Sequence, residues 1–205
     1  MGKILGHQIR NHFRNNWFIP VLPVALILFG VLFSNVNNKI GVSAVAIGMM
    51  ALMFGYFAAA ITVIVGDYNM FFGDSALFYE STPISPSAKT FSRFLYYLIM
   101  FTIYSLYVAL ICFLFMTAPS VDGGVIYMSW ADISKAINEV GVRNILIGVA
   151  WVLIALFNNI ISIIFAVTLG GGKKLRRFGL GGPVLVYIGL GMIEGAVIYI
   201  LDKFD

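Results

Sequence analysis

Long uncharged apolar runs alternate with shorter polar segments along this chain of 205 residues. A helix needs about 20 mostly apolar residues to cross a bilayer, and five segments meet that length. They are residues 17–36, 42–65, 94–118, 144–169 and 183–201. None of them alternates with a period of two, which disfavours a lipid-facing β-barrel. The pattern therefore predicts an all-α polytopic membrane protein, with residues 1–205 forming a single transmembrane domain of five spans.

The segment before the first span is amphipathic. Within residues 1–16, the apolar side chains Ile4, Leu5, Ile9 and Phe13 recur at helical spacing between basic and polar residues. A helix with one apolar stripe and a basic face is typical of segments that lie in the membrane interface. We therefore predict a short surface helix here.

Composition supports lipid as the main solvent of the chain. Hydrophobic residues make up 60% and charged residues only 11%, and the mean hydropathy is +0.95. A soluble domain carries about 25% charged residues, so both a soluble fold and a disordered chain are excluded. The net charge of +4 could indicate nucleic-acid binding, but in a membrane protein Lys and Arg mainly set orientation. We therefore expect no nucleic-acid partner.

The basic residues are distributed unevenly between the two sides that five spans create. One side receives nine of the 13 basic residues: Lys3, Arg10, Arg14, Lys89, Arg93, Lys173, Lys174, Arg176 and Arg177. The positive-inside rule places that side in the cytoplasm. We expect a multi-pass cell-membrane protein with a cytoplasmic N-terminus, a cytoplasmic segment at 66–93 and an extracellular loop at 119–143.

A compact basic loop, GGGKKLRRFGLGG, joins the last two predicted spans. Clusters of Lys and Arg next to a span attract anionic lipid headgroups. The residues expected to make these lipid contacts are Lys173, Lys174, Arg176 and Arg177.

No motif in the chain indicates catalysis. Gly170 to Lys174 has the glycines and lysines of a phosphate-binding loop, but it lacks the required spacing and the Ser or Thr that holds magnesium. His7 and His12 are five residues apart, so they do not form an i, i+4 metal pair, and we predict that both are solvated. The single cysteine, Cys112, is predicted to be a packing residue. We expect no enzyme activity, no metal and no cofactor bound by this chain.

The most informative polar stretch lies within residues 66–93. Asp74 or Ser75 can cap a short helix that Thr82 and Pro83 would end, and the stretch from Ser85 to Ser87 supplies a second cap before the third span. The result would be a short aromatic helix parallel to the membrane. Two interpretations remain open, an ordinary interfacial loop and a docking element for a cytoplasmic partner.

Residues 73–85, GDSALFYESTPIS, followed by Lys89, resemble a known family. The stretch is similar to the loop between the second and third spans of type-2 ABC exporter permeases. The resemblance implies that this loop holds a coupling helix seated in a groove of a separate cytoplasmic ABC ATPase subunit. It also implies a second permease subunit, as a homodimer or heterodimer, with ATP and Mg bound by the partner ATPase. The N-terminal helix is similar to the connector helix of that family, whose members usually have six spans where five are predicted here.

The resemblance assigns the contacts with the ATPase to residues of this loop. These residues are Asp74, Leu77, Phe78, Tyr79, Glu80, Thr82, Pro83, Ile84 and Ser85. Among them we expect Tyr79, Glu80, Pro83 and Ile84 to carry most of the interaction.

Polar groups inside two spans are candidates for a translocation pathway. Glu194 is the only charge within a predicted span, and ionisable residues there are costly and often functional. It either contacts substrate or a partner group, or lies near the outer interface, or is a protonated packing residue. Asn158 and Asn159 either bond between helices or line the pathway.

Three functions are considered. The first is the permease half of an ATP-driven exporter, whose substrate would be an antimicrobial or amphipathic peptide, a drug or a lipid. The second is an ion-coupled secondary transporter that uses Glu194, although the chain shows no internal repeat. The third is a non-transporting membrane scaffold or immunity protein.

Overall fold

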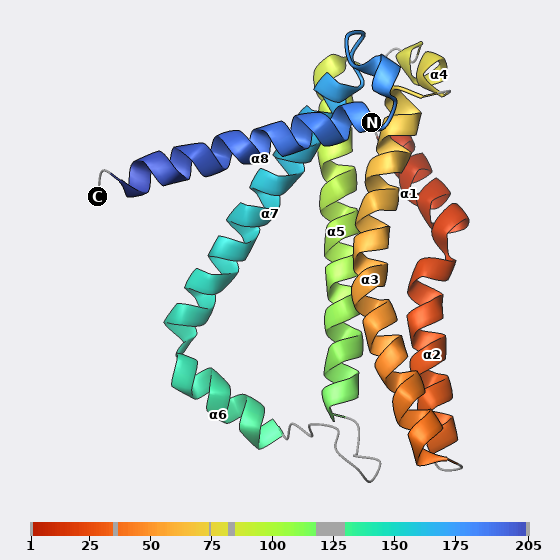
Figure 1. Cartoon of the computed structure of the whole chain (residues 1–205), viewed down its shortest axis with the longest axis vertical. Coiled ribbons are helices and arrows are strands. Elements are labelled where there is room, and N and C mark those ends of the chain that lie inside the picture. Colours follow the sequence, from red (N-terminus) through yellow and green to blue (C-terminus); the bar gives the residue numbers. More distant parts are fainter. Residues whose placement is uncertain (1, 35–36, 74, 82–84, 118–129, 204–205) are drawn as a thin grey trace. The chain divides into compact units, whose positions relative to one another are not determined.

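The computed structural model describes residues 2–34, 37–73, 75–81, 85–117 and 130–203, and its regular elements in these ranges are all helical (Figure 1). The helices are α1 (Gly2–Asn16), α2 (Phe18–Ser34), α3 (Asn38–Phe71), α4 (Ala76–Glu80), α5 (Pro86–Thr117), α6 (Trp130–Val140), α7 (Val142–Gly170), the 3-10 turn η1 (Arg176–Phe178) and α8 (Gly181–Asp202). The predicted all-α class is confirmed.

Four of these helices, α3, α5, α7 and α8, are each long and apolar enough to cross a membrane. A fifth crossing is formed if α1 and α2, which meet at an angle of 44°, are counted as one broken span. The protein is therefore a polytopic helical membrane protein. The helix predicted at the membrane surface is present as α1. In the structure it is the first helix of this bent pair.

The helices on either side of α4 are longer than the apolar runs predict. Helix α3 continues to Phe71 and α5 begins at Pro86, so most of the predicted polar segment 66–93 is helical. The prediction was too wide because it treated Asp67 and Arg93 as loop residues. Both are instead buried and paired with one another, which removes the cost of placing a charge at the end of a packed helix. The predicted extracellular loop 119–143 likewise contains α6 and the start of α7.

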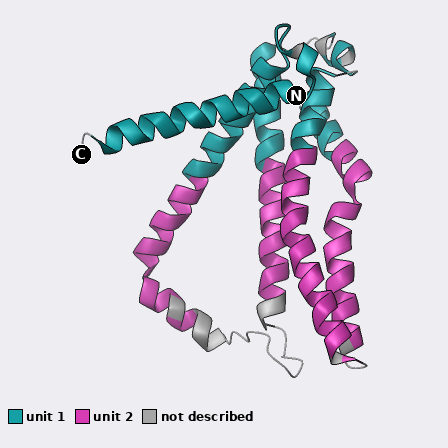
Figure 2. Ribbon diagram, in the orientation of Figure 1, with its two compact units in different colours: residues 1–9, 63–98, 154–205 teal, residues 10–62, 99–153 magenta. Residues whose placement is uncertain are grey.

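Two compact units divide the chain (Figure 2). One consists of residues 10–62 and 99–153. Within it, α2 and α3 approach closely at two glycines. A Cβ at Gly30 would lie 2.7 Å from the Val45 amide nitrogen, and a Cβ at Gly48 would lie 3.0 Å from the amide nitrogen of Ile27. Small residues at such contacts let helix backbones pack tightly within a membrane.

The other unit consists of residues 1–9, 63–98 and 154–205. Ile4 of α1, Met70 of α3 and Tyr79 of α4 form a buried apolar cluster in this unit. The C-terminal half of α7 also contributes buried residues, including Ile160, Ala166 and Val167. This unit contains the candidate coupling helix, the buried ion pair and a polar pocket.

Candidate functional site

Along the chain, helix α4 connects the long helices α3 and α5 (Figure 1). It has two different faces. Tyr79 is 8% exposed and packs against Ile4 and Met70, and its ring centroid lies 5.8 Å from that of Phe71. Leu77 is 80% exposed. Burial raises the pKa of the Tyr79 hydroxyl, which therefore stays protonated. The helix thus presents a large apolar side chain outward while its aromatic anchor points into the protein.

The assignment of Tyr79 as a principal contact with a partner stays a prediction. Its ring is covered by residues of this chain, because a helix of five residues gains too little from its own hydrogen bonds and needs an anchor. Leu77 is the exposed member of the predicted set. Phe78 and Glu80 lie within α4, but their side chains are outside the described part of the structure. The other predicted contacts outside the described residues are Asp74, Thr82, Pro83 and Ile84.

The C-terminal side of α4 is tied to the protein. The Nζ of Lys89 donates a hydrogen bond to the Tyr79 carbonyl oxygen at 2.8 Å. Ser85 acts as the predicted second cap, since its Oγ accepts a bond from the Ala88 amide at 3.4 Å. Ser75 stands at the N-terminal cap position of α4 without a side-chain capping bond. Lys89 therefore closes the C-terminal end of the short helix.

A buried ionic network joins α3, α5 and α7 in the same unit. Asp67 is fully buried, and its two carboxylate oxygens each accept a bond from the Nε of Arg93 at 3.0 Å, with a further bond of 2.6 Å from Nη2. The Tyr97 hydroxyl donates to the same carboxylate at 3.0 Å, and Arg93 reaches the Thr168 hydroxyl of α7 at 2.9 Å. The Arg93 guanidinium also lies 5.2 Å from the Phe71 ring centroid.

Sequence reasoning missed this network. A signal for it exists, because Asp67 follows the second apolar run closely and Arg93 directly precedes the third. Opposite charges at the adjoining ends of two consecutive antiparallel helices can meet, and the structure brings these two together.

The three predicted pathway residues lie together in one pocket between α7 and α8. Asn158 and Asn159 of α7 and Glu194 of α8 line a cavity of about 270 Å³. Ser162 and Tyr187, which the sequence did not single out, also line it. The Tyr187 hydroxyl donates a hydrogen bond to the Asn159 side-chain oxygen at 3.0 Å. Asn159 is thus an interhelical contact, as one of its two interpretations predicts, and it also lies at the pocket.

His12 is not solvated as predicted. It is 4% exposed, and its Nε2 lies 2.9 Å from the Tyr104 hydroxyl. The buried face of α1 runs through positions 4, 8 and 12, and this spacing of four places His12 on one stripe with Ile4 and Gln8. His7 is on the exposed side, with its ring centroid 6.3 Å from that of Tyr79.

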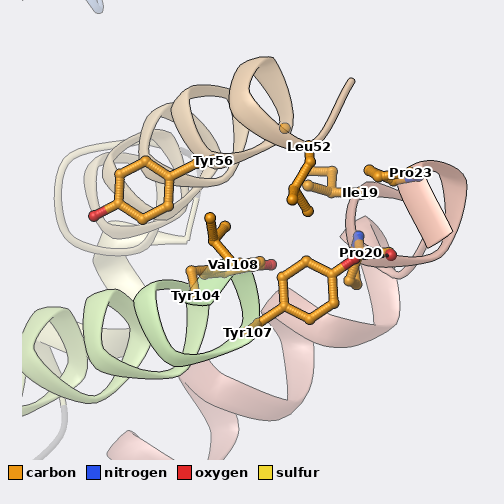
Figure 3. Close-up of a pocket in the computed structure, with 9 residues that line it drawn as sticks. Ile19, Pro20, Pro23, Leu52, Tyr56, Tyr104, Tyr107 and Val108 are labelled. Atoms are coloured by element: carbon orange, nitrogen blue, oxygen red, sulfur yellow. Dashed lines mark hydrogen bonds between the residues drawn. The ribbon is translucent and has the colours of Figure 1, made fainter. Parts of the chain in front are cut away.

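A second, smaller hollow lies near the start of α2 (Figure 3). The Tyr107 hydroxyl points toward Pro20 and donates a 2.5 Å hydrogen bond to its carbonyl oxygen. Pro20 and Pro23 lack amide hydrogens, so the carbonyl groups four residues before each proline lose their intrahelical donor. The hollow leaves no room for even a water-sized ligand.

The basic loop after α7 exposes part of its predicted headgroup set. Lys173, Lys174 and Arg177 are exposed, and the guanidinium of Arg177 lies 4.8 Å from the Phe178 ring centroid. Arg176 begins η1, and its side chain lies outside the described part. Among the described residues, no three His, Cys, Asp or Glu side chains come together to hold a metal ion.

Comparisons with protein-family models, curated proteins and solved structures find no match to this chain.

Proposed function

We propose that this chain is the transmembrane permease subunit of an ATP-driven exporter and couples to a separate cytoplasmic ATPase through α4. The resemblance of residues 73–85 to the coupling loop of type-2 ABC exporter permeases motivates the proposal. The observation that carries it is the orientation of α4, with Tyr79 buried against α1 and α3 and Leu77 exposed. An anchored helix with an outward apolar residue is suited to enter a groove on another protein.

The surroundings of α4 support a mechanical role. Force applied to the short helix would reach α1 and α3 through Tyr79 and would reach α5 through the bond from Lys89. Asp67 and Arg93 then connect α3 with α5 and, through Thr168, with α7. Movement of α4 by a partner would therefore act on several helices of its unit at once.

The proposal is tested at Leu77 rather than at Tyr79, whose truncation would disturb the packing of α4 itself. Membranes from cells that contain the full chain are solubilised, and the copurifying proteins are identified by mass. We expect an ABC ATPase to be recovered, and the Leu77→Asp variant to recover it at least about tenfold less well, as for a central interface residue. Ile137→Asp in α6, which also places a charge at an exposed apolar position, is the matched control.

Equal recovery of the ATPase with wild type and Leu77→Asp would remove α4 as the coupling element. Recovery of no ATPase at all would remove the exporter proposal.

A second candidate function is an ion-coupled transporter, and the pocket at Glu194 is the observation that favours it. The two functions differ in their energy source. Transport that continues without ATP but stops when the proton gradient is dissipated would favour the second candidate.

A further inference from the structure

The pocket between α7 and α8 contains polar groups that lack partners. In the described part of the chain, Glu194, Asn158 and Ser162 make no side-chain hydrogen bond or ion pair. The residues that line the pocket include no lysine, arginine or histidine. A carboxylate, an amide and a hydroxyl thus line one open cavity, in which Asn158 and Glu194 are exposed, and no positive group balances the charge.

Polar side chains without hydrogen-bond partners are costly in free energy when they lie deep in the membrane. Asn158 lies 12 residues before the end of α7, and Glu194 lies 13 residues after the start of α8. At about 1.5 Å per residue, both are roughly 18–20 Å from the turn that joins the two helices. The hydrocarbon core is about 30 Å thick, so this position is close to its middle if both helices cross along the membrane normal. Unpaired polar groups at such a depth require a partner or a water-filled cavity.

We infer that this pocket binds a primary ammonium group attached to an apolar body. Such a group donates three hydrogen bonds and carries the charge that complements Glu194. Asn158 and Ser162 line the same pocket, and their side-chain oxygens are acceptors of the kind that such N–H groups need. Leu190 and Ala155 supply apolar lining for the body of the ligand.

The size of the cavity distinguishes this ligand from an inorganic cation. A bound cation such as Ca²⁺ is held by oxygen ligands at about 2.3–2.6 Å on all sides. The cavity of about 270 Å³ is instead slightly smaller than typical small-molecule pockets, which span roughly 300–1,000 Å³. The inference names the substrate class of the proposed exporter and in that respect rests on the proposed function.

Binding is measured with the full chain in lipid nanodiscs and needs no ATPase. The probe is dansylcadaverine, a fluorescent aromatic sulfonamide with a primary amine, and the neutral comparison is its N-acetylated form. We expect dansylcadaverine to bind wild type saturably and the acetylated form to show only partition into lipid. Glu194→Gln should weaken binding of the amine at least about tenfold, because a charge-assisted bond is lost.

Two further variants separate the pocket from general effects. Asn158→Leu should also weaken amine binding, whereas Glu139→Gln, which removes an exposed carboxylate of α6, should leave it unchanged. Equal affinity of wild type and Glu194→Gln, or equal binding of the two probes, would overturn the inference. So would a change of oligomeric state in Glu194→Gln without specific amine binding, since a second copy would then cover the carboxylate.

Failure here can be told apart from failure of the proposed function. The ATPase test at Leu77 is read by copurification and does not involve the pocket.

Discussion

Asp67 and Glu194 are both carboxylates in long apolar helices, yet their surroundings are opposite. Asp67 is fully buried and accepts bonds from Arg93 and Tyr97. Glu194 is exposed on α8 and lines a pocket that holds no basic residue. A buried charge persists only when it is paired and hydrogen-bonded, whereas an unpaired one within a span marks a site of function. We therefore expect Asp67 to be structural, and Glu194 is the residue that we propose for ligand binding.

Removing the charge of Asp67 should destabilise the protein strongly. Asp67→Asn leaves the buried guanidinium of Arg93 without a counter-charge, and breaking a buried pair on one side costs about 3–5 kcal/mol. The loss is measured as a lower free energy of unfolding in detergent.

The exposed pair Lys135–Glu139 in α6, whose charged atoms are 4.0 Å apart, supplies the comparison. Removing its charge through Glu139→Gln should cost less than about 1 kcal/mol, because solvent screens both groups. Similar losses for Asp67→Asn and Glu139→Gln would show that the buried network is not structural.

At the scale of elements, the contact between the end of α7 and the start of α8 depends on glycine. A Cβ at Gly182 would collide with the Gly170 carbonyl oxygen, and a Cβ at Gly170 would collide with the backbone of Pro183. The two helices can therefore meet this closely only without side chains at these positions. Their contact positions the walls of the pocket that contains Glu194.

Gly182→Ala should therefore destabilise the α7–α8 contact by about 1–3 kcal/mol, as for overpacking of a tight core. Gly189→Ala in the same helix is the control, since a Cβ there meets nothing within 4 Å. That substitution should be neutral or should stabilise the helix by about 0.5–1 kcal/mol, because alanine loses less backbone entropy than glycine. Thermal unfolding of both variants in one detergent checks the difference in sign, and equal effects would contradict it.

At the scale of the whole molecule, the distribution of charge predicts the orientation. Nine of the 13 basic residues lie on one side of the predicted topology, including Lys173 and Lys174 directly after α7. Lys135 lies before α7 and is exposed, as is Lys174. If α7 crosses the membrane, these two lysines lie on opposite sides.

Cysteine labelling tests this orientation. In a Cys112→Ala background, which removes the single native cysteine, Lys135→Cys should react with a membrane-impermeant maleimide added to intact cells. Lys174→Cys should react only after the membrane is permeabilised. Labelling of both variants from one side would show that α7 does not cross, and the reverse pattern would place the N-terminus outside.

Much of the candidate site could be anticipated from residue type alone. Glu194, Asn158 and Asn159 were predicted because polar groups in apolar runs are costly wherever the helices lie. Their shared pocket with Ser162 and Tyr187 could not be predicted, because it depends on how α7 meets α8. For the same reason, sequence reasoning placed His12 in solvent and did not predict that Tyr79 is covered by residues of this chain, since an aromatic or imidazole ring suits either face of an amphipathic helix.

The sequence by itself determined that the chain is helical, that it resides in a membrane and roughly where each long helix lies. Runs of about 20 apolar residues leave the backbone no partners in lipid except its own hydrogen bonds, so local composition is sufficient. Only the tertiary structure decided which polar residues have hydrogen-bond or ion-pair partners. Asp67 is neutralised by Arg93, 26 residues away, and α4 exposes Leu77 because Tyr79 is covered by residues of α1 and α3. Such pairings depend on contacts between distant segments, which periodicity along one helix does not encode.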